Sequence, residues 1–594
     1  MIDPVTLAVL KGRLEQIADE MDATLFRSAF NPIIAEAHDA SHGLYHAETG
    51  ETLVQGKSGL PVFVGAMSFA VRAVIDKVAR EAGPGEGPAE GDVYIFNDPY
   101  DGGTHLSDFK LVRPFFRDGK VYCYLASVGH WHDVGGNVPG NYNPVATECF
   151  QEGMLIPPVK LFDKGELRQD IVEILKANSR LPGSLYGDLN GQINALALGV
   201  QRLGALLDDY GDEVVAEALA ELKARAAKLM RAHIAELPRG RVSAEDFLDN
   251  DGIVDAPLKI ALDLTIDEDG MVLDFSRSAP ACAGPVNIAR STAIASCYVA
   301  LKHLFPDVPA NAGVLAPIRF VIPEGTLLSV TAPKPVGGYT ETILRVIDVV
   351  FCAMAQVAPE RVNGCAYGTI NALSIAGHRA DGRRWVMFSF FGGGHGGHPE
   401  GDGLNHGNAP ISTATIPPLE ILEAAYPVKF TEWALRPDSG GPGRHRGGLG
   451  ARYGIELLEE SAEAFLFGER GRFAPPGVVG GKAGARNRFR YPQGDGPQDD
   501  GLQDGGPQDD GEAEPPFASK MVGIKLARGQ RLRLETPGGG GYGAPFERDP
   551  QAVAEDLRLG YVGAEAAARD YGVVLDDSGA VDAAATRKLR EAAE

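Results

Sequence analysis

The order of helical and strand-like patterns along the 594 residues constrains the fold more than any other feature of the sequence. Apolar residues recur at helical spacing through residues 4–25, and short strand-like runs dominate residues 92–134. Residues 165–238 are mainly helical, and strand-like runs return after residue 253. Because no regular alternation of strand, helix and strand is present, we expect an α+β fold rather than a doubly wound sheet. This fold should be one large, mixed, β-rich unit with helices at its periphery.

The same patterns predict individual elements. Asp3-Pro4 favours the start of a helix, because aspartate caps helices and proline is tolerated in their first turn. Further helices are expected at 65–80, 214–234, 291–304 and 343–357. Strands are expected at 43–45, 52–54, 93–96, 109–116, 120–128, 260–264, 271–275, 522–526 and 531–534.

Charge and hydropathy argue against several classes of partner. The chain has 56 Lys+Arg and 80 Asp+Glu, a formal net charge of −24. Nucleic acids and anionic membranes bind basic surfaces, so we expect neither as the main partner. No apolar run approaches the ~20 residues of a membrane helix. The first residues, which include Asp3 and Glu15, lack the basic-then-apolar pattern of a secretory signal, so we expect a cytoplasmic protein.

The six cysteines are scattered along the chain and include no C-x-x-C pair. A disulfide framework would be denser, and a thiolate zinc site would show paired spacing. We therefore expect most of the cysteines to be reduced residues of the core.

Glycine is in excess, with 75 of the 594 residues against a typical share of ~7%. Much of this excess lies in three segments that we expect to be loops, at 392–403, 440–450 and 538–543.

Residues 492–516 have a composition of their own, PQGDGPQDDGLQDGGPQDDGEAEPP, in which GPQDDG occurs twice and no basic residue occurs. Such a segment cannot bury a core, so we expect it to be disordered. Strand-like runs stand on both sides of it, which indicates a loop extension between strands and not a domain boundary. Its acidic residues carry a third of the net charge, and they are Asp495, Asp499, Asp500, Asp504, Asp509, Asp510, Glu512 and Glu514.

Residues 92–133 contain metal-binding side chains arranged around a predicted hairpin. Asp118-Gly119, between two strand-like runs, is a hairpin turn signal. A hairpin centred there places residue 107 opposite residue 130, to within about one residue. His105 and Asp108, just before one strand, should therefore lie beside His130 at the end of its partner.

Two imidazoles and a carboxylate suit a Zn²⁺ or Mn²⁺ site with an open coordination position. His132 and Asp133 lie within reach, either to orient a ligand or to transfer protons. The alternative is that all these residues are polar loop residues at strand ends. The segment HDASH, with His38, Asp39 and His42, is another source of ligands, but spacing alone does not bring it near.

A second cluster of metal-binding residue types stands in GGGHGGHPEGDGLNHG. Its many glycines leave little side-chain packing to organise a site, so a glycine-rich loop with incidental histidines is the favoured interpretation. The residues concerned are His395, His398, Glu400, Asp402 and His406. The sequence contains no GxxxxGK[ST] phosphate loop and no G-x-S-x-G nucleophile elbow.

Five long motifs resemble the B subunits of the hydantoinase/oxoprolinase family, which includes the large subunits of acetone and acetophenone carboxylases. Together with the first 29 residues they span nearly the whole chain in one order. The motifs are FNDPYDGGTHLSD (96–108), GHWHDVGGNVPG (129–140), CFQEGMLIPPVKL (149–161), RPDSGGPGRHRGGLG (436–450) and TPGGGGYGAPFERDP (536–550).

The resemblance implies a divalent metal held by an aspartate of the HDAS-like motif, by the His and Asp of THLSD and by the first His of GHxHD. These fall on Asp39, His105, Asp108 and His130. The hairpin argument reaches three of them independently, and the resemblance adds Asp39. Mixed His/Asp ligation suits Zn²⁺, Mn²⁺ and Fe²⁺ alike.

The resemblance also implies a partner, an A subunit that resembles acetate- and sugar-kinase-type ATPases. By this resemblance, that subunit uses ATP to phosphorylate the carbonyl oxygen of the substrate, which the B subunit then processes. Phosphorylation makes an amide carbon electrophilic and supplies a leaving group. We therefore expect a hetero-oligomer in which residues 1–545 form the catalytic region and 546–594 a helical tail.

Three functions remain open at this stage. The favoured one is ATP-dependent hydrolysis of a cyclic amide, of the hydantoinase or 5-oxoprolinase type, because carboxylase large subunits are generally longer. The second is carboxylation of a ketone, and the third is a non-catalytic assembly role with structural histidines. Three departures from the family pattern are the local sequence Glu36-Ala37-His38-Asp39, the histidines His395 and His398 in the glycine-rich loop, and the acidic segment 492–516.

Overall fold

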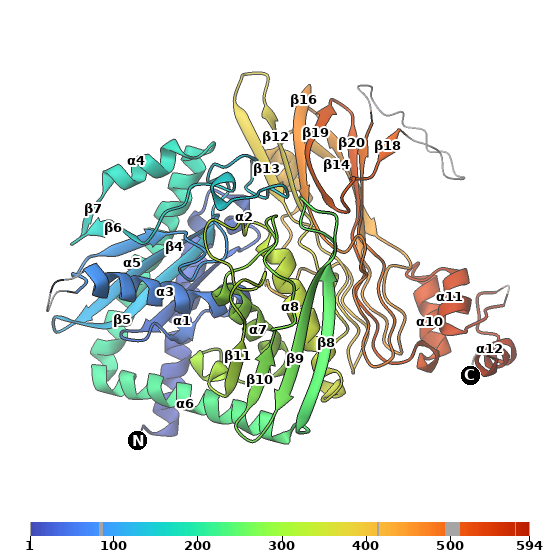
Figure 1. Ribbon diagram of the computed structural model, residues 1–594, viewed down its shortest axis with the longest axis horizontal. Helices are drawn as coiled ribbons and strands as arrows, with labels where there is room; N and C mark the ends of the chain where they lie inside the picture. Colours follow the sequence, from blue (N-terminus) through green and yellow to red (C-terminus); the bar gives the residue numbers. More distant parts are fainter. Residues whose placement is uncertain are drawn as a thin grey trace. The chain divides into compact units, whose positions relative to one another are not determined.

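The chain forms two units whose residues alternate along the sequence (Figure 1). The computed structural model describes residues 2–81, 83, 87–412, 415–493, 511–576 and 578–592. Unit 1 comprises Met1–Arg241, Leu262–Val346 and Ile411–Pro417, and unit 2 comprises Val242–Ala261, Ile347–Pro410 and Pro418–Glu594. Helices and several sheets occur in both, which confirms the α+β class.

The N-terminal part of unit 1 contains a mixed set of helices and strands. Its helices are α1 (Pro4–Ser28), α2 (Pro32–Ala35), α3 (Pro61–Glu81), α4 (Gln169–Ala177), α5 (Pro182–Tyr210) and α6 (Asp212–Glu236). Its strands are β1 (Ala40–His46), β2 (Thr52–Gln55), β3 (Val93–Phe96), β4 (Asp108–Arg117), β5 (Lys120–His130), β6 (Val159–Asp163) and β7 (Glu166–Leu167). The strands form one sheet in the order β2-β1-β5-β4-β3-β6-β7.

The hairpin of β4 and β5 lies near the middle of this sheet, and its turn has the predicted chemistry. Asp118 and Gly119 have φ values of 47° and 74°, so both central residues are left-handed. Asp-Gly tolerates this backbone, and the resulting turn matches the twist of the two strands. The hairpin prediction is therefore confirmed, and β4 and β5 extend it to Asp108 and His130.

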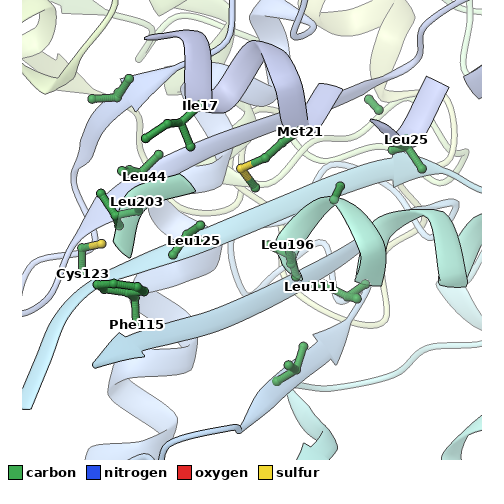
Figure 2. Close-up of a cluster of buried hydrophobic side chains, with 14 of the residues drawn as sticks. Ile17, Met21, Leu25, Leu44, Leu111, Phe115, Cys123, Leu125, Leu196 and Leu203 are labelled. Carbon is green, nitrogen blue, oxygen red and sulfur yellow. The ribbon is translucent and has the colours of Figure 1, made fainter. Parts of the chain in front are cut away.

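Helices α1 and α5 pack against this sheet through apolar side chains (Figure 2). Asp3 caps α1 as predicted, because its Oδ1 accepts hydrogen bonds of 3.0 Å from the amides of Val5 and Thr6. Each fully buried leucine contributes about 1.5–3 kcal/mol to stability. The α1 residues that face the core repeat at helical spacing and are Leu7, Leu10, Leu14, Ile17, Met21 and Leu25.

The chain passes between the two units within β8 (Gly240–Leu248), β9 (Leu258–Ile266) and α8 (Tyr339–Met354). A four-stranded sheet has the order β11-β10-β9-β8 and also contains β10 (Met271–Asp274) and β11 (Ile318–Val321). Strands β10 and β11 pair in parallel. Helix α7 (Arg290–Leu304) precedes β11 and is buried along nearly its whole length.

Besides its parts of β8, β9 and α8, unit 2 contains two further sheets and four α-helices among its described residues. One sheet has the order β13-β12-β16-β19 and is built from β12 (Ala372–His378), β13 (Arg384–Ser389), β16 (Ser461–Phe467) and β19 (Lys520–Ala527). The other has the order β14-β15-β20-β17-β18, with β14 (Val428–Leu435), β15 (Ala451–Leu457), β17 (Arg488–Pro492), β18 (Glu512–Ala513) and β20 (Arg531–Glu535). The helices are α9 (Leu419–Ala425), α10 (Pro550–Arg558), α11 (Ala564–Tyr571) and α12 (Ala583–Glu591).

The glycine-rich segments of unit 2 pack directly against one another, backbone to backbone. The amide of Gly394 donates to the carbonyl of Pro537 at 3.0 Å, and the amide of Gly539 donates to that of Gly448 at 3.0 Å. A Cβ at Gly394 would overlap the carbonyl oxygen of Gly448. The glycine excess is therefore required by close approach of extended chains, a reason that the sequence patterns did not reveal.

The prediction of disorder for 492–516 is wrong at both ends of that segment. Pro492 pairs with Glu512, and Tyr491 pairs with Ala513, in an antiparallel ladder. The side chain of Glu512 is only 5% exposed, and its carboxylate lies 3.0 Å from Nε of Arg533, which compensates its charge. Residues 494–510 lie outside the described part of the chain. The ends of the segment thus belong to adjacent strands, as expected for an extension between strands.

Two further sequence predictions concern the cysteines and membrane-spanning helices. All six cysteines are free thiols and five of them are buried, as predicted. Within the described residues, no helix is both long enough and apolar enough to cross a membrane. The boundary proposed between residues 545 and 546 stays a prediction.

We predict that Gly394→Ala destabilises unit 2 by about 3 kcal/mol or more, because the new methyl group has to displace the backbone at Gly448. Gly204→Ala is the matched control, since no atom lies within 4 Å of a Cβ built at this position of α5. It should raise stability by about 0.5–1 kcal/mol. Thermal and denaturant unfolding measure both changes, and equal stabilities of the two variants would contradict the packing argument.

A second prediction concerns Asp188 of α5, whose carboxylate accepts hydrogen bonds from the amides of Phe30 and Asn31 at 2.8 and 3.1 Å. Burial raises the pKa of Asp188 to about 7. The folded chain therefore binds this proton more tightly than the unfolded chain, in which the pKa is about 3.9. The stability that Asp188 contributes is therefore lost as the pH rises from about 4 to about 7.

Asp188→Asn should remove this loss, because the amide oxygen still accepts hydrogen bonds but cannot ionise. The melting temperature of the variant relative to the wild-type chain should increase between pH 4 and pH 8. A difference that stays constant over this range would refute the assignment.

Candidate metal centre

The pairing of β4 with β5 places Asp108 directly opposite His130. Near the turn, Arg117 faces Lys120 and Phe116 faces Val121, as a regular hairpin requires. A bulge between Phe115 and Phe116 then shifts the register by one residue. For this reason position 108, and not the expected 107, faces residue 130.

His105 joins this pair from the loop that leads into β4. Asn97 anchors the loop, because its Nδ2 donates to the carbonyl oxygens of Leu106 at 2.7 Å and Met154 at 2.8 Å. The amide of Trp131 donates to the carbonyl of Ser107 at 2.8 Å. These bonds fix the loop against the end of β5, so that His105 turns towards Asp108.

The three side chains form a compact, buried cluster. Nδ1 of His105 lies 2.7 Å from Oδ2 of Asp108, and Nδ1 of His130 lies 3.3 Å from Oδ1. The potential ligand atoms all lie within 4.8 Å of one another. Burial raises the pKa of Asp108, but the charges and hydrogen bonds of His105 and His130 outweigh burial and hold this pKa well below its usual range.

Asp39 approaches the cluster because β1 pairs with β5. Ala40 faces Gly129 in that ladder, and the amide of His130 donates to the carbonyl of Asp39 at 3.1 Å. Burial raises the pKa of Asp39 to about 7, while the charge of His130 lowers it and that of Asp108 raises it. The carboxylates of Asp39 and Asp108 therefore interact with each other and with His130.

The donor set fits a divalent cation. Among the described residues, Oδ1 of Asp39 and Nε2 of His105 are both shielded from solvent and have no hydrogen-bond partner. Leaving such groups unpaired costs about 1–3 kcal/mol each, which coordination would recover. A cation would also neutralise the repulsion between Asp39 and Asp108. Asp39, His105, Asp108 and His130 as the ligand set nevertheless stays a prediction.

Two tyrosines that were not identified from the sequence line the same space. The ring centroid of His105 lies 4.7 Å from that of Tyr339 and 5.6 Å from that of Tyr142. Burial, followed by the charge of Asp108, raises the pKa of both phenols well above the ordinary value. Both hydroxyls therefore stay protonated at neutral pH and are able to donate a hydrogen bond. Tyr142 stands only two residues beyond the GHWHDVGGNVPG motif, whereas Tyr339 is remote in sequence.

The two residues proposed for proton transfer have different surroundings. His132 is 6% exposed. The carboxylate of Asp133 lies 3.0 Å from Nη1 of Arg180 and accepts the amides of Gly135 and Arg180 at 3.2 and 2.9 Å. These contacts hold the loop after β5. Catalytic roles for His132 and Asp133 stay predictions.

The other residues of HDASH point elsewhere. The ring of His38 stacks on Phe26 with centroids 4.2 Å apart. His42 contacts Asp22 at 2.7 Å and Ser127 at 2.9 Å, within the core of the sheet. Of the three, Asp39 alone interacts with His130 and Asp108, although it is not one of the residues whose ligand atoms all lie within 4.8 Å of one another.

Within the part of the chain that the structure describes, the second histidine cluster, in unit 2, brings no three potential ligand atoms within 4.8 Å of one another. His406 contacts the hydroxyl of Tyr453 and accepts a hydrogen bond from Nε1 of Trp433 at 3.1 Å. Asp402 pairs with Arg548 at 2.6 and 2.7 Å. These groups hold the glycine-rich segments in place, in agreement with the loop interpretation.

Comparison with known proteins identifies the family. The sequence profile of the hydantoinase B/oxoprolinase family matches residues 3–545. The chain belongs to this family. It is 33% identical to the β subunit of caprolactamase from Pseudomonas jessenii, over 100% of this chain and 99% of the relative. It is also 30% identical to 5-oxoprolinase 1 of Arabidopsis thaliana, over 91% of this chain and 42% of the relative.

Two solved structures share the fold of this family member. The crystal structure of ATP-dependent caprolactamase from Pseudomonas jessenii has a TM-score of 0.87 at 31% identity and matches 100% of both chains. The nucleotide-free structure of acetone carboxylase has a TM-score of 0.88 at 21% identity, over 100% of this chain and 83% of that chain. At this low identity, the likeness to acetone carboxylase shows the fold alone.

We predict that the purified chain binds about one Mn²⁺, Zn²⁺ or similar ion, and that His105→Ala abolishes this binding. His38→Ala is the matched control, because its ring stacks on Phe26 and not on the cluster. Metal analysis after gentle purification and equilibrium dialysis against Mn²⁺ provide the measurement. Absence of metal from the wild-type chain, or equal uptake by His105→Ala, would exclude this site.

Proposed function

We propose that this chain is the metal-bearing B subunit of an ATP-dependent hydrolase that opens cyclic amides. The observation that carries the proposal is the buried cluster of His105, Asp108 and His130 in a chain that matches its family almost end to end. Relatives named caprolactamase and 5-oxoprolinase support the substrate class, since both enzymes are named after cyclic amides.

In this proposal Asp39, His105, Asp108 and His130 hold one divalent ion. Such an ion would supply a Lewis acid that polarises a carbonyl or phosphoryl oxygen and makes a bound water more acidic. The protein contributes geometry. Thr104 donates to Oδ2 of Asp108, so that the carboxylate is oriented from outside the cluster.

Tyr142 and Tyr339 would bind the substrate in this proposal. Both are nearly buried, at 5% and 4% exposure, and both rings lie beside His105. A neutral phenol that donates a hydrogen bond stabilises negative charge on a reacting oxygen, above all where water is excluded. Their side chains would therefore orient the carbonyl or phosphoryl oxygen next to the ligands.

The partner in this proposal is an A-type ATPase subunit that phosphorylates the carbonyl oxygen of the cyclic amide. The name of the caprolactamase relative, a β subunit, supports a hetero-oligomer. In 5-oxoprolinase 1 the matched part is 42% of a longer chain, so further residues accompany this region there. We expect the complex to act in the cytoplasm.

Hydrolysis is preferred to ketone carboxylation because of the level of identity. The caprolactamase relative is 33% identical in sequence. The acetone carboxylase structure, although equally similar in fold, is only 21% identical.

The test is reconstitution with an A-type ATPase subunit, most directly one encoded by a neighbouring gene. We expect ATP-dependent opening of a cyclic amide such as a hydantoin, 5-oxoproline or caprolactam. His130→Ala should lower this activity by more than about 100-fold, whereas His38→Ala should leave it unchanged. The measurement is product formation together with phosphate release.

The outcomes separate the three functions. ATP turnover that requires a ketone and bicarbonate would replace hydrolysis by carboxylation. Full activity of the complex after His130→Ala would support a non-catalytic assembly subunit and exclude both enzymatic functions.

A further inference from the structure

Gln192 is a buried polar residue on helix α5, on the side of the helix that packs against the sheet of the metal centre. It is fully buried, and all of its polar atoms are used. Nε1 of Trp131 donates to Oε1 of Gln192 at 2.9 Å. In turn, Nε2 of Gln192 donates to the carbonyl of Phe109 at 3.0 Å and to Oγ of Ser127 at 3.2 Å.

The orientation of this amide is fixed by its partners. An indole nitrogen only donates, and a backbone carbonyl only accepts. Oε1 must therefore face Trp131, while Nε2 must face Phe109. A flipped amide would lose both hydrogen bonds, so Gln192 links Trp131 to Phe109 in one orientation only.

Two partners of Gln192 each border a residue of the cluster. Phe109 follows Asp108 on β4, and Trp131 follows His130 at the end of β5. The rings of Phe109 and Trp131 also stack, with centroids 3.9 Å apart and planes inclined by 8°. One side chain thus ties together the two strand ends that carry Asp108 and His130.

A second residue of α5, Asp188, lies one helical turn before Gln192 and is linked to His130 through Asn31. Asp188 accepts hydrogen bonds from the amides of Phe30 and Asn31, at 2.8 and 3.1 Å. Nδ2 of Asn31 donates to the carbonyl of His130 at 2.8 Å. Because residues four apart lie on one face of a helix, Asp188 and Gln192 act from the same side of α5.

The chain of hydrogen bonds continues beyond Ser127 in one consistent direction. Nε2 of His42 lies 2.9 Å from Oγ of Ser127, and Nδ1 of His42 lies 2.7 Å from Oδ1 of Asp22. An aspartate that accepts from Nδ1 leaves Nε2 to accept from the serine. Although Asp22, His42 and Ser127 resemble a nucleophilic triad, all three are buried, at 0–1% exposure. We assign them to the support of Gln192 and not to catalysis.

We propose that Gln192 is a positioning residue of the metal centre, which sets the separation of Asp108 and His130 through Phe109 and Trp131. This inference rests on the metal site of the proposed function. A metal site depends on ligand positions to within about 0.5 Å, and the hydrogen bonds behind the ligands provide that accuracy. Loss of the amide would leave the Trp131 nitrogen and the Phe109 carbonyl without their partner.

The test compares Mn²⁺ affinity in variants of the full chain. Gln192→Met keeps the length of the side chain but removes the amide, and we expect at least tenfold weaker binding. Gln201→Met is the matched control, because Gln201 is an exposed residue of the same helix. It should bind within twofold of the wild-type chain. The visible absorption spectrum of bound Co²⁺ should change only in Gln192→Met, as expected for altered ligand geometry.

General destabilisation is controlled by Leu196→Ala, one turn further along α5 in the apolar core. This variant should lower the melting temperature yet keep Mn²⁺ affinity within twofold at 25 °C. If Gln192→Met does not fold, Trp131→Phe provides the test, since it removes the indole donor and part of the ring but keeps an aromatic side chain. We expect at least threefold weaker binding for Trp131→Phe.

The results distinguish failure of this inference from failure of the proposed function. If the wild-type chain binds Mn²⁺ and His105→Ala does not, unchanged affinity and an unchanged Co²⁺ spectrum in Gln192→Met overturn the positioning role alone. The same holds if Leu196→Ala loses as much affinity as Gln192→Met. If the wild-type chain binds no divalent ion, both proposals fail.

Discussion

The antiparallel pairing of β4 with β5 is the interaction on which the metal centre depends. It joins Asp108 to His130 across more than twenty residues of sequence, and a left-handed turn at Asp118-Gly119 sets where the pairing begins. Since side chains alternate between the two faces of a strand, a slip of one residue turns a side chain to the opposite face. The bulge at Phe115 makes such a shift within the ladder, so the observed register includes that irregularity. Neighbouring elements add to this pair. The pairing of β1 with β5 brings the preceding residue Asp39 near His130, and α5 packs against β4 and β5.

Local patterns predicted the elements of unit 1 well, together with the three ligands that one hairpin brings together. Such a hairpin is a short-range structure whose geometry follows from its turn residues. Asp39 was different, because it arrives through pairing between β1 and β5, strands that are distant in sequence. The HDASH segment offered Asp39 as a possible ligand, but only the family resemblance assigned it to this site. Tyr339 and Gln192 were missed for the same reason, since nothing near them in the sequence marks the distant contact that they make. For glycine, composition correctly indicated unusual segments but not that they pack on each other.

Some candidate polar groups have hydrogen-bond partners and others retain buried atoms without one, and the sequence alone does not distinguish the two kinds. His406, Asp402 and Asp133 have the residue types of an active site, yet each is held by nearby donors or acceptors. His105 and Asp39 retain buried atoms without partners among the described residues. The two kinds differ in whether their hydrogen-bonding atoms have partners, and only the three-dimensional structure shows this. This difference is also what makes the first cluster, and not the more histidine-rich second one, the candidate centre.

The backbone packing of the glycine segments has a thermodynamic consequence for unit 2. Contacts such as those between Gly394, Gly448 and Gly539 bury peptide groups and almost no hydrocarbon. Exposure of apolar surface raises the heat capacity on unfolding, whereas exposure of polar surface lowers it. This part of the chain should therefore contribute little to the heat-capacity change or even reduce it. Its stability curve is then flatter than that of a hydrophobic core of equal size, so the region keeps a similar stability over a wider range of temperature.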